Sequence, residues 1–519
     1  MQLFDNFAII IRLTLGLQIR GVIRALGKYS VPAEVRALKR PDGTKVKNIG
    51  GHYYVYESSS KRVKVPGPDG SWISKVKTTS GKCIGRITLS DGFIPNNTRL
   101  ADDEVTVFGY GDYALAMSGG NTLNELKKKF NAADANQIYV VAVITVVHGF
   151  TYMRDMSMVH NESFLKLRFP DVHVGEDALR TLYENLGKKR IRVDAFEQQL
   201  IDGSSKKVAF DGHVIACASE LNDISAYGYK ASKLNSEQIN WMTAYDVKTG
   251  HPLASEFFNG SDPDKSVLSQ FFDRFTFTGT LFVVDRGFNT EANKKLLSSD
   301  GNSYIMPMIQ GRNDYKDVYE SIKFDKRRSF VYDKDGYSSL VYYYDHRSSG
   351  NGGGIAFLDT TRQSAERHTY IKNMNAGKKK YTEDGLKASE KDFGLFILET
   401  SDAEKSPREL FSDYKSRWSI ETFYNYVDNT MDFKSLYQED YCRTEGLGFI
   451  IQVAGMIHRE LTEITRKHKL QLKKVMRTLK GLRLSKEKNN WHIKNAVKEK
   501  RELAEKLSIS LDPDIILSA

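Results

Sequence analysis

The sequence has few cysteines and no long hydrophobic run. Three cysteines, Cys83, Cys217 and Cys442, occur in 519 residues. They are too few and too scattered for a disulfide framework, and none has a histidine at zinc-site spacing. A reducing cytoplasm is therefore expected. No apolar run reaches the ~18 residues that a membrane span requires. The best candidate, residues 7–19, is short and is interrupted by Arg12, so we predict neither a membrane protein nor a secreted one.

Several well-known catalytic motifs are also absent. The chain has no G-x-x-x-x-G-K-[ST] phosphate loop, no G-x-S-x-G and no H-E-x-x-H. The glycines at 350 and 352–354 do not complete G-x-G-x-x-G, because Ile355 follows them. Nucleotide hydrolysis and zinc proteolysis are thus unsupported, and no nucleotide cofactor is expected.

Positive charge is concentrated at the two ends of the chain. Residues 1–80 contain 14 Lys or Arg against 5 Asp or Glu, and residues 459–506 contain 16 against 6, whereas the stretch between is acidic. Basic ends favour an extended polyanion such as nucleic acid as partner. For the C-terminal stretch, solvated helix surface remains an equal alternative.

The length and the residue pattern predict several structural regions. At 519 residues, 40% hydrophobic and 27% charged, the chain is globular and long enough for two to four domains. Strand runs precede an alternation of strands and helices after residue 206, which predicts an α/β core. Residues 1–29 read as helical. The expected regions are 1–110 (basic, mostly β, DNA-binding), 111–205 (helical), 206–314 (first part of the core), 315–395 (β-rich insertion), 396–457 (rest of the core) and 458–519 (basic, helical).

Three carboxylates stand out by their positions. Asp211 lies in an opening β run, Asp285 ends the apolar run LFVV, and Glu421 lies in a helical segment. Each also has a simpler interpretation. Asp211-Gly212 is a strong hairpin-turn signal, Asp285 could merely end a strand, and Glu421 could form a surface ion pair with Arg417 four residues earlier.

Two features favour a functional interpretation. A carboxylate at the C-terminal end of a buried strand lies where open α/β sheets bind ligands. On a helix, Tyr414, Arg417, Glu421 and Asp428 fall within a sector of roughly 60°. Phosphodiester chemistry needs such a set of groups, because two Mg²⁺ ions can be held by two or three carboxylates.

The sequence resembles the Asp-Asp-Glu (DDE) transposases of bacterial insertion sequences. The signature Tyr, two residues, Arg, three residues, Glu, six residues, Lys appears as Tyr414, Arg417 and Glu421. The two other acid motifs appear as Phe210-Asp211-Gly212 and Asp285-Arg286-Gly287-Phe288. The resemblance covers residues 206–457 well, and the β regions at 47–95 and 315–395 fit the family too.

The resemblance implies a fold and a function. We expect a ribonuclease-H-like α/β core in which Asp211, Asp285 and Glu421 bind two Mg²⁺ or Mn²⁺ ions. Tyr414, Arg417 and Arg286 would bind the DNA backbone. The protein would nick element ends and join the 3′-hydroxyl to target DNA, without a nucleotide, as a homodimer near the bacterial nucleoid. A catalytically impaired DNA-binding relative and a nuclease without strand transfer are the alternatives.

One position departs from the signature. Asp428 stands where the family has lysine. If Asp428 faces DNA, its replacement by lysine should tighten end binding and raise cleavage. If it pairs with a local base, the same change should destabilise the fold.

Overall fold

The structure is a computed structural model in which two units are described separately. The units are Met1–Thr106 and Val107–Ala519. The backbone is described for residues 30–66, 72–96, 107–228, 236–326, 328–334, 336–347, 353–487 and 490–518. The helix expected over residues 1–29 lies outside these ranges.

The first unit is a small antiparallel sheet. It contains α2 (Ala33–Ala37), β1 (Thr44–Ile49), β2 (His52–Pro66), β3 (Trp72–Thr88) and β4 (Gly92–Pro95), with the strands in the order β1-β2-β3-β4. Val35, Val55 and Ile87 form its buried core. Gly85 is required where β3 meets β4, since a Cβ there would lie 2.3 Å from the Ile94 carbonyl oxygen. The β structure expected over residues 47–95 is thus confirmed for the described residues 47–66 and 72–95.

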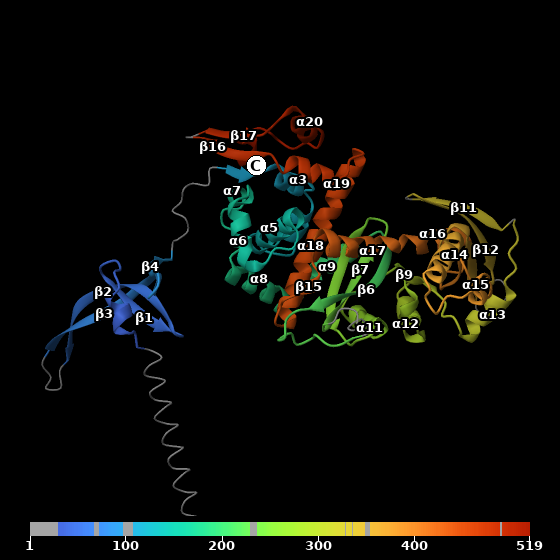
Figure 1. Ribbon diagram of the computed structural model, residues 1–519, viewed down its shortest axis with the longest axis horizontal. Helices are drawn as coiled ribbons and strands as arrows, with labels where there is room; N and C mark the ends of the chain where they lie inside the picture. The colour runs from blue at the N-terminus through green and yellow to red at the C-terminus, as the bar shows by residue number, and fades with distance from the viewer. Residues whose placement is uncertain are drawn as a thin grey trace, which may run out of the picture. The chain divides into compact units, whose positions relative to one another are not determined.

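A ten-stranded mixed sheet organises the second unit (Figure 1). Its strand order is β11-β12-β13-β14-β10-β9-β6-β7-β8, and β15 pairs with the end of β6. β6, β9 and β10 run parallel to one another, whereas β7 and β14 join this group antiparallel. A mixed α/β architecture with a large sheet is consistent with a ribonuclease-H-like core. The strands are β6 (Lys207–Cys217), β7 (Gln238–Asp246), β8 (His251–Asn259), β9 (Leu281–Val284), β10 (Ser303–Pro307), β11 (Ser329–Lys334), β12 (Tyr337–Asp345), β13 (Gly354–Asp359), β14 (Leu395–Thr400) and β15 (Ser435–Leu436).

Helices cover both faces of this sheet. On one face, Phe210 of β6 packs in a core with α11 (Asp264–Arg274) and α12 (Glu291–Leu297). On the other, Ala209 and Ile215 pack in a core with α17 (Trp418–Asn425) and α18 (Tyr441–Lys467). Alternate residues of one strand thus face different cores, as the period of two requires. α16 (Pro407–Ser416) precedes α17, and a short π-helix at Tyr426–Thr430 follows it.

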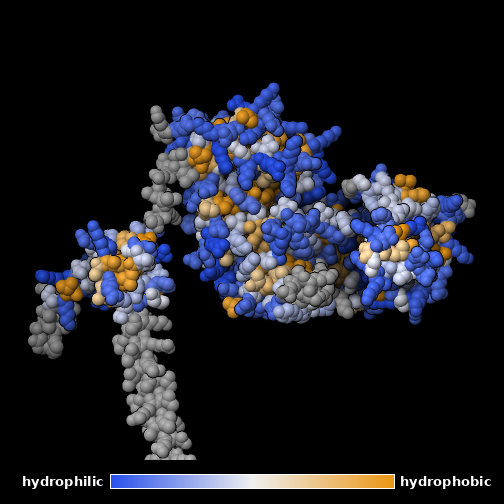
Figure 2. Space-filling view, viewed as in Figure 1, coloured by the Kyte–Doolittle hydropathy of each residue, from blue (hydrophilic) through white to orange (hydrophobic). Residues whose placement is uncertain are grey.

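A helical region surrounds α18. It contains α3 (Gly111–Ser118), α4 (Thr122–Lys127), α5 (Ala132–His148), α6 (Met153–Asn161), α7 (Leu165–Arg168), α8 (Glu176–Lys188) and α9 (Ile191–Asp202). No single helix in the described residues is long and apolar enough to cross a membrane. α5 and α6 meet that test only as a pair bent by 88°. The face of the second unit that is visible in Figure 2 is mostly hydrophilic.

Two regions differ from their expected secondary structure. Residues 315–395 contain α13 (Asn313–Ser321), α14 (Thr360–Asn375) and α15 (Glu383–Ser389) besides strands, and those strands extend the main sheet. Residues 458–519 contain α19 (Leu472–Leu479), α20 (Lys498–Lys506) and α21 (Pro513–Ser518), but also the hairpin β16 (Arg483–Glu487) and β17 (Asn490–Lys494). β16 pairs with β5 (Val107–Gly109). Backbone pairing therefore joins the end of the expected N-terminal region to the C-terminal one.

A buried ion cluster fastens the helical region to the sheet. Arg190, which is 10% exposed, pairs with Glu197 of α9 at 3.2 Å and with Glu445 of α18. Both carboxylates also accept hydrogen bonds from β8, Glu197 from the Ser255 amide and Glu445 from the Phe257 amide. One guanidinium therefore pairs with two buried carboxylates at the junction of α9, α18 and β8, and burial still raises the pKa of Glu197 to about 7.

We predict that His458 makes stability fall in mild acid. His458 of α18 stacks on Tyr426, and burial lowers its pKa from 6.5 to about 4. As the pH falls below ~6.5, the imidazole of His458 becomes protonated in the unfolded chain but stays neutral in the folded one. The free energy of unfolding should therefore fall by about 2 kcal/mol between pH 7 and pH 5. His458→Phe keeps a stacking ring and should make the free energy of unfolding fall less steeply over this range; it should not abolish the dependence, since burial also lowers the pKa of His160 to about 4. The exposed His368 provides the control His368→Gln, and equal slopes for both variants would refute the prediction.

Candidate active site

Two of the three predicted carboxylates belong to neighbouring parallel strands, Asp211 within β6 and Asp285 directly after β9. β6 and β9 pair in a register that places Phe210 opposite Val284, so Asp211 and Asp285 follow on the same side of the sheet. Asp211 itself pairs with Thr243 of β7 within the strand, so its interpretation as a hairpin turn is wrong. Asp285 follows the last residue of β9 and accepts a hydrogen bond from the Arg286 amide at 2.6 Å.

The third carboxylate reaches the site from α17. Ile420 and Phe423 bury the inner side of this helix in the core beneath it, while Glu421 between them is 35% exposed. The Tyr424 hydroxyl donates a hydrogen bond of 2.8 Å to the Asp211 carbonyl. That bond fixes α17 against β6 and holds Glu421 beside the sheet.

Arg417 links the carboxylates. It lies at the break between α16 and α17 and is 14% exposed. Its guanidinium donates to Glu421 Oε1 at 3.0 Å and lies 3.8 Å from Asp211 Oδ2. The ion pair between Glu421 and Arg417 that the spacing suggested is therefore present, but it lies against Asp211 rather than on an isolated helix surface.

Burial and charged neighbours together set the pKa of Asp211. Burial raises the pKa of Asp211 to about 6; Arg417 opposes this rise, and the charges of Asp285 and Glu421 add to it. The Tyr414 phenol belongs to the same group, since burial raises its pKa while Arg417 lowers it and Asp285 raises it. Arg286 is exposed beside Asp285.

The donor set fits a divalent cation by its chemistry, because three carboxylates from three segments supply hard oxygen ligands. Within the described ranges, however, no three His, Cys, Asp or Glu side chains are gathered at metal-binding spacing. The guanidinium of Arg417 supplies the positive charge nearest to Asp211 and Glu421. A bound cation would have to take over that neutralising role.

Sequence reasoning missed His213, two residues after Asp211 on β6. Its ring stacks on Tyr424, with centroids 4.5 Å apart, and its Nε2 lies 2.9 Å from Asp428 Oδ1. The period of two along a strand places His213 on the same face as Asp211, and this spacing could have indicated His213 from the sequence. The helical stripe that was expected to include Asp428 does not run on one α-helix, because the chain breaks at Arg417 and becomes a π-helix at Tyr426–Thr430.

The pairing of Asp428 with His213 favours the structural interpretation of this position. Asp428→Lys would place an ammonium against the imidazole and remove the acceptor. We therefore expect a loss of about 1 kcal/mol in stability and slower cleavage, rather than the faster cleavage expected from the signature alone. Melting temperature and cleavage rate measured on this variant test the point. Faster cleavage at an unchanged melting temperature would instead support the expectation that Asp428 faces DNA.

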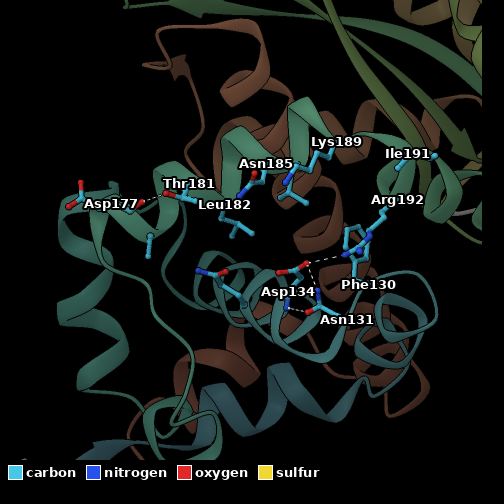
Figure 3. Close-up of a pocket in the computed structure, with 13 residues that line it drawn as sticks. Phe130, Asn131, Asp134, Asp177, Thr181, Leu182, Asn185, Lys189, Ile191 and Arg192 are labelled. Carbon is cyan, nitrogen blue, oxygen red and sulfur yellow. Dashed lines mark hydrogen bonds and ion pairs between the residues drawn. The ribbon is translucent and has the colours of Figure 1, made fainter.

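A separate pocket of about 910 Å³ lies between α5 and α8 (Figure 3). Asp134 and Arg192 at its rim pair with each other at 3.3 Å, and the Asn131 side chain caps α5. None of the predicted site residues lines it. The pocket therefore contributes nothing to the carboxylate site.

Comparison with known proteins gives a family match over the region that contains the candidate site. No curated protein matches the chain. A solved structure described as "Cryo-EM structure of piggyBac transposase synaptic complex with hairpin DNA (SNHP)" is similar at 11% identity, covering 74% of this chain and 81% of that chain with a TM-score of 0.35. At that TM-score the similarity is not evidence for the fold or the function of this chain. The family model described as "Transposase DDE domain" matches residues 202–454, a range that contains Asp211, Asp285 and Glu421. This match supports a DDE transposase.

Proposed function

We propose that the protein is a DNA transposase of the Tyr-Arg-Glu-Lys branch found in bacterial insertion sequences, with a ribonuclease-H-like core. It nicks the ends of its element and joins the freed 3′-hydroxyl to target DNA. The proposal is supported by Asp211 on β6 and Asp285 directly after the paired strand β9, and by Arg417, which contacts both Asp211 and Glu421 of α17, within the range that the DDE domain model matches.

The proposed centre uses these acids as cation ligands. Asp211, Asp285 and Glu421 would hold Mg²⁺ or Mn²⁺, whose chemistry is to activate the attacking oxygen and stabilise the leaving one. Each step hydrolyses one phosphodiester or exchanges it for another, so no nucleotide is consumed. A homodimer near the nucleoid, in the cytoplasm, would bring two element ends together.

The surrounding residues have separate roles in this proposal. Tyr414, Arg417 and Arg286 would bind the DNA backbone next to the acids. Arg417 would exchange its contacts with Asp211 and Glu421 for contacts with phosphate, since guanidinium binds both groups with the same planar fork.

A catalytically impaired relative that only binds DNA is the second candidate. It is favoured by Asp428, which replaces the signature lysine and pairs with His213. A phosphate contact that the signature provides would then be absent beside the site.

One assay separates the candidates. The full chain is incubated with DNA from the two flanks of its own reading frame, a target plasmid and Mg²⁺ or Mn²⁺. Flank DNA joined to plasmid supports a transposase. Nicks without joined products indicate a nuclease without strand transfer, and binding without nicks indicates the impaired relative.

A further inference from the structure

The strands β2 and β3 continue beyond the rest of their sheet. β1 pairs only with residues 52–57 of β2, and β4 pairs only with residues 85–88 of β3. From Ser58 opposite Ser80 to Pro66 opposite Trp72, the two strands pair with each other alone (Figure 1). We call these segments, residues 58–66 and 72–80, the ribbon.

The ribbon presents positive charge without compensation. Lys61, Arg62, Lys75 and Lys77 are all exposed, and its described residues include no Asp or Glu. In the described part of Met1–Thr106, no carboxylate lies within ion-pair distance of these four side chains. Lys61 stands directly opposite Lys77, an arrangement that destabilises an isolated antiparallel pair. A polyanion would relieve that repulsion.

One face of the ribbon combines these lysines with hydroxyl groups. By the period of two, Ser59, Lys61 and Val63 share a face with their partners Thr79, Lys77 and Lys75. Ser59 and Thr79 are bridged across the strands at 2.9 Å. Ammonium and hydroxyl groups are the side chains that contact phosphate and base edges in DNA complexes.

We propose that the ribbon binds in the major groove of duplex DNA. That groove is about 12 Å wide and admits a two-stranded β-ribbon. Nine paired residues at about 3.4 Å each span about one turn of the duplex. Like the proposed function, this proposal has duplex DNA as the partner. It adds the structural element that binds the DNA, which is the ribbon. It differs from the alternative in which the charges only discourage strand pairing with other chains.

The test compares matched charge changes on the full chain. The ribbon variant is Lys61→Gln/Lys75→Gln/Lys77→Gln, and the control is Lys378→Gln/Lys379→Gln/Lys380→Gln, three exposed lysines in the other unit. Binding to labelled duplex DNA is measured by anisotropy in EDTA over a range of salt. The ribbon variant should lower the log–log salt slope by about 2.7, because about 0.9 ion is released for each of the three lost phosphate contacts. Between 1 M and 0.1 M salt, this difference in slope corresponds to binding weakened about 500-fold. Equal effects of the two triple variants would overturn the proposal.

A second variant separates binding from folding. Lys61→Glu places a carboxylate opposite Lys77, which should stabilise the ribbon while weakening DNA binding. Lower stability together with unchanged binding would mean that Lys61 has only a structural role.

The groove is tested with modified nucleic acids. Glucosylated hydroxymethylcytosine fills the major groove, and duplex RNA has a major groove too narrow for side chains to read. Both should abolish the difference between wild type and the ribbon variant, and persistence of that difference would overturn major-groove binding. Because binding is measured without metal, failure of cleavage would refute the proposed function and leave this result intact.

Discussion

Asp211→Asn should abolish metal-dependent DNA cleavage while leaving DNA affinity within a few-fold of wild type. Asp211 lies between β7 and β9, faces both Arg417 and Glu421, and is 21% exposed. Asparagine keeps the shape but removes the negative charge that a cation requires. We expect Asp285→Asn and Glu421→Gln to behave alike, each with a loss of cleavage of roughly 10³-fold or more, because the three groups act as one unit.

The matched control is Asp413→Asn. Asp413 lies on α16 but pairs with Lys207 and Lys405, at 2.6 and 2.9 Å, rather than with the site. It should lower stability and leave the cleavage rate of folded protein nearly unchanged. A carboxylate variant of the site that cleaves at the wild-type rate would remove that residue from the centre.

Arg190→Ala should cause a large loss of stability. It leaves Glu197 and Glu445, each 1% exposed, without their shared guanidinium. Removing one partner of a buried ion pair typically costs about 3–5 kcal/mol. Calorimetry should show a melting temperature several degrees lower.

Two further variants give this prediction its controls. Arg192→Ala breaks an exposed pair with Asp134 at 3.3 Å and should change stability by less than about 1 kcal/mol. Arg190→Met/Glu197→Gln/Glu445→Gln removes the buried charges together and should recover much of the loss. A melting temperature for Arg190→Ala within one degree of wild type would contradict the assigned role of the cluster.

The strand pattern of the core was predictable because it is local. β6 to β10 are short runs bounded by turn residues, and the apolar run before Asp285 forms a buried strand. The β16–β17 hairpin was not predicted, since RLSKE has a single apolar residue and the alternation in NWHIK spans only five residues. Its pairing with β5 joins Ser485 to Val107, a contact that no local window contains.

In the candidate site, too, local features were predictable and long-range contacts were not. Sequence motifs indicated the three acids, but not Arg417 against Asp211 or His213 against Asp428. The partner of His213 lies 215 residues away in sequence, and Glu445, one partner of Arg190, lies 255 residues away. Arg190 follows Lys188 and Lys189 and reads as surface charge, although the fold buries it. Long-range pairing of charges leaves no periodic trace in a single sequence.

The central claim is that Asp211, Asp285 and Glu421 together hold divalent cations. The most direct measurement is affinity cleavage of the full chain by Fe²⁺ and ascorbate in the presence of DNA, with the backbone cuts mapped by mass spectrometry. We predict cuts next to residues 211, 285 and 421 that excess Mg²⁺ suppresses and that Glu421→Gln weakens. Cuts confined to other segments, or cuts at these residues that Mg²⁺ does not suppress, would contradict the account.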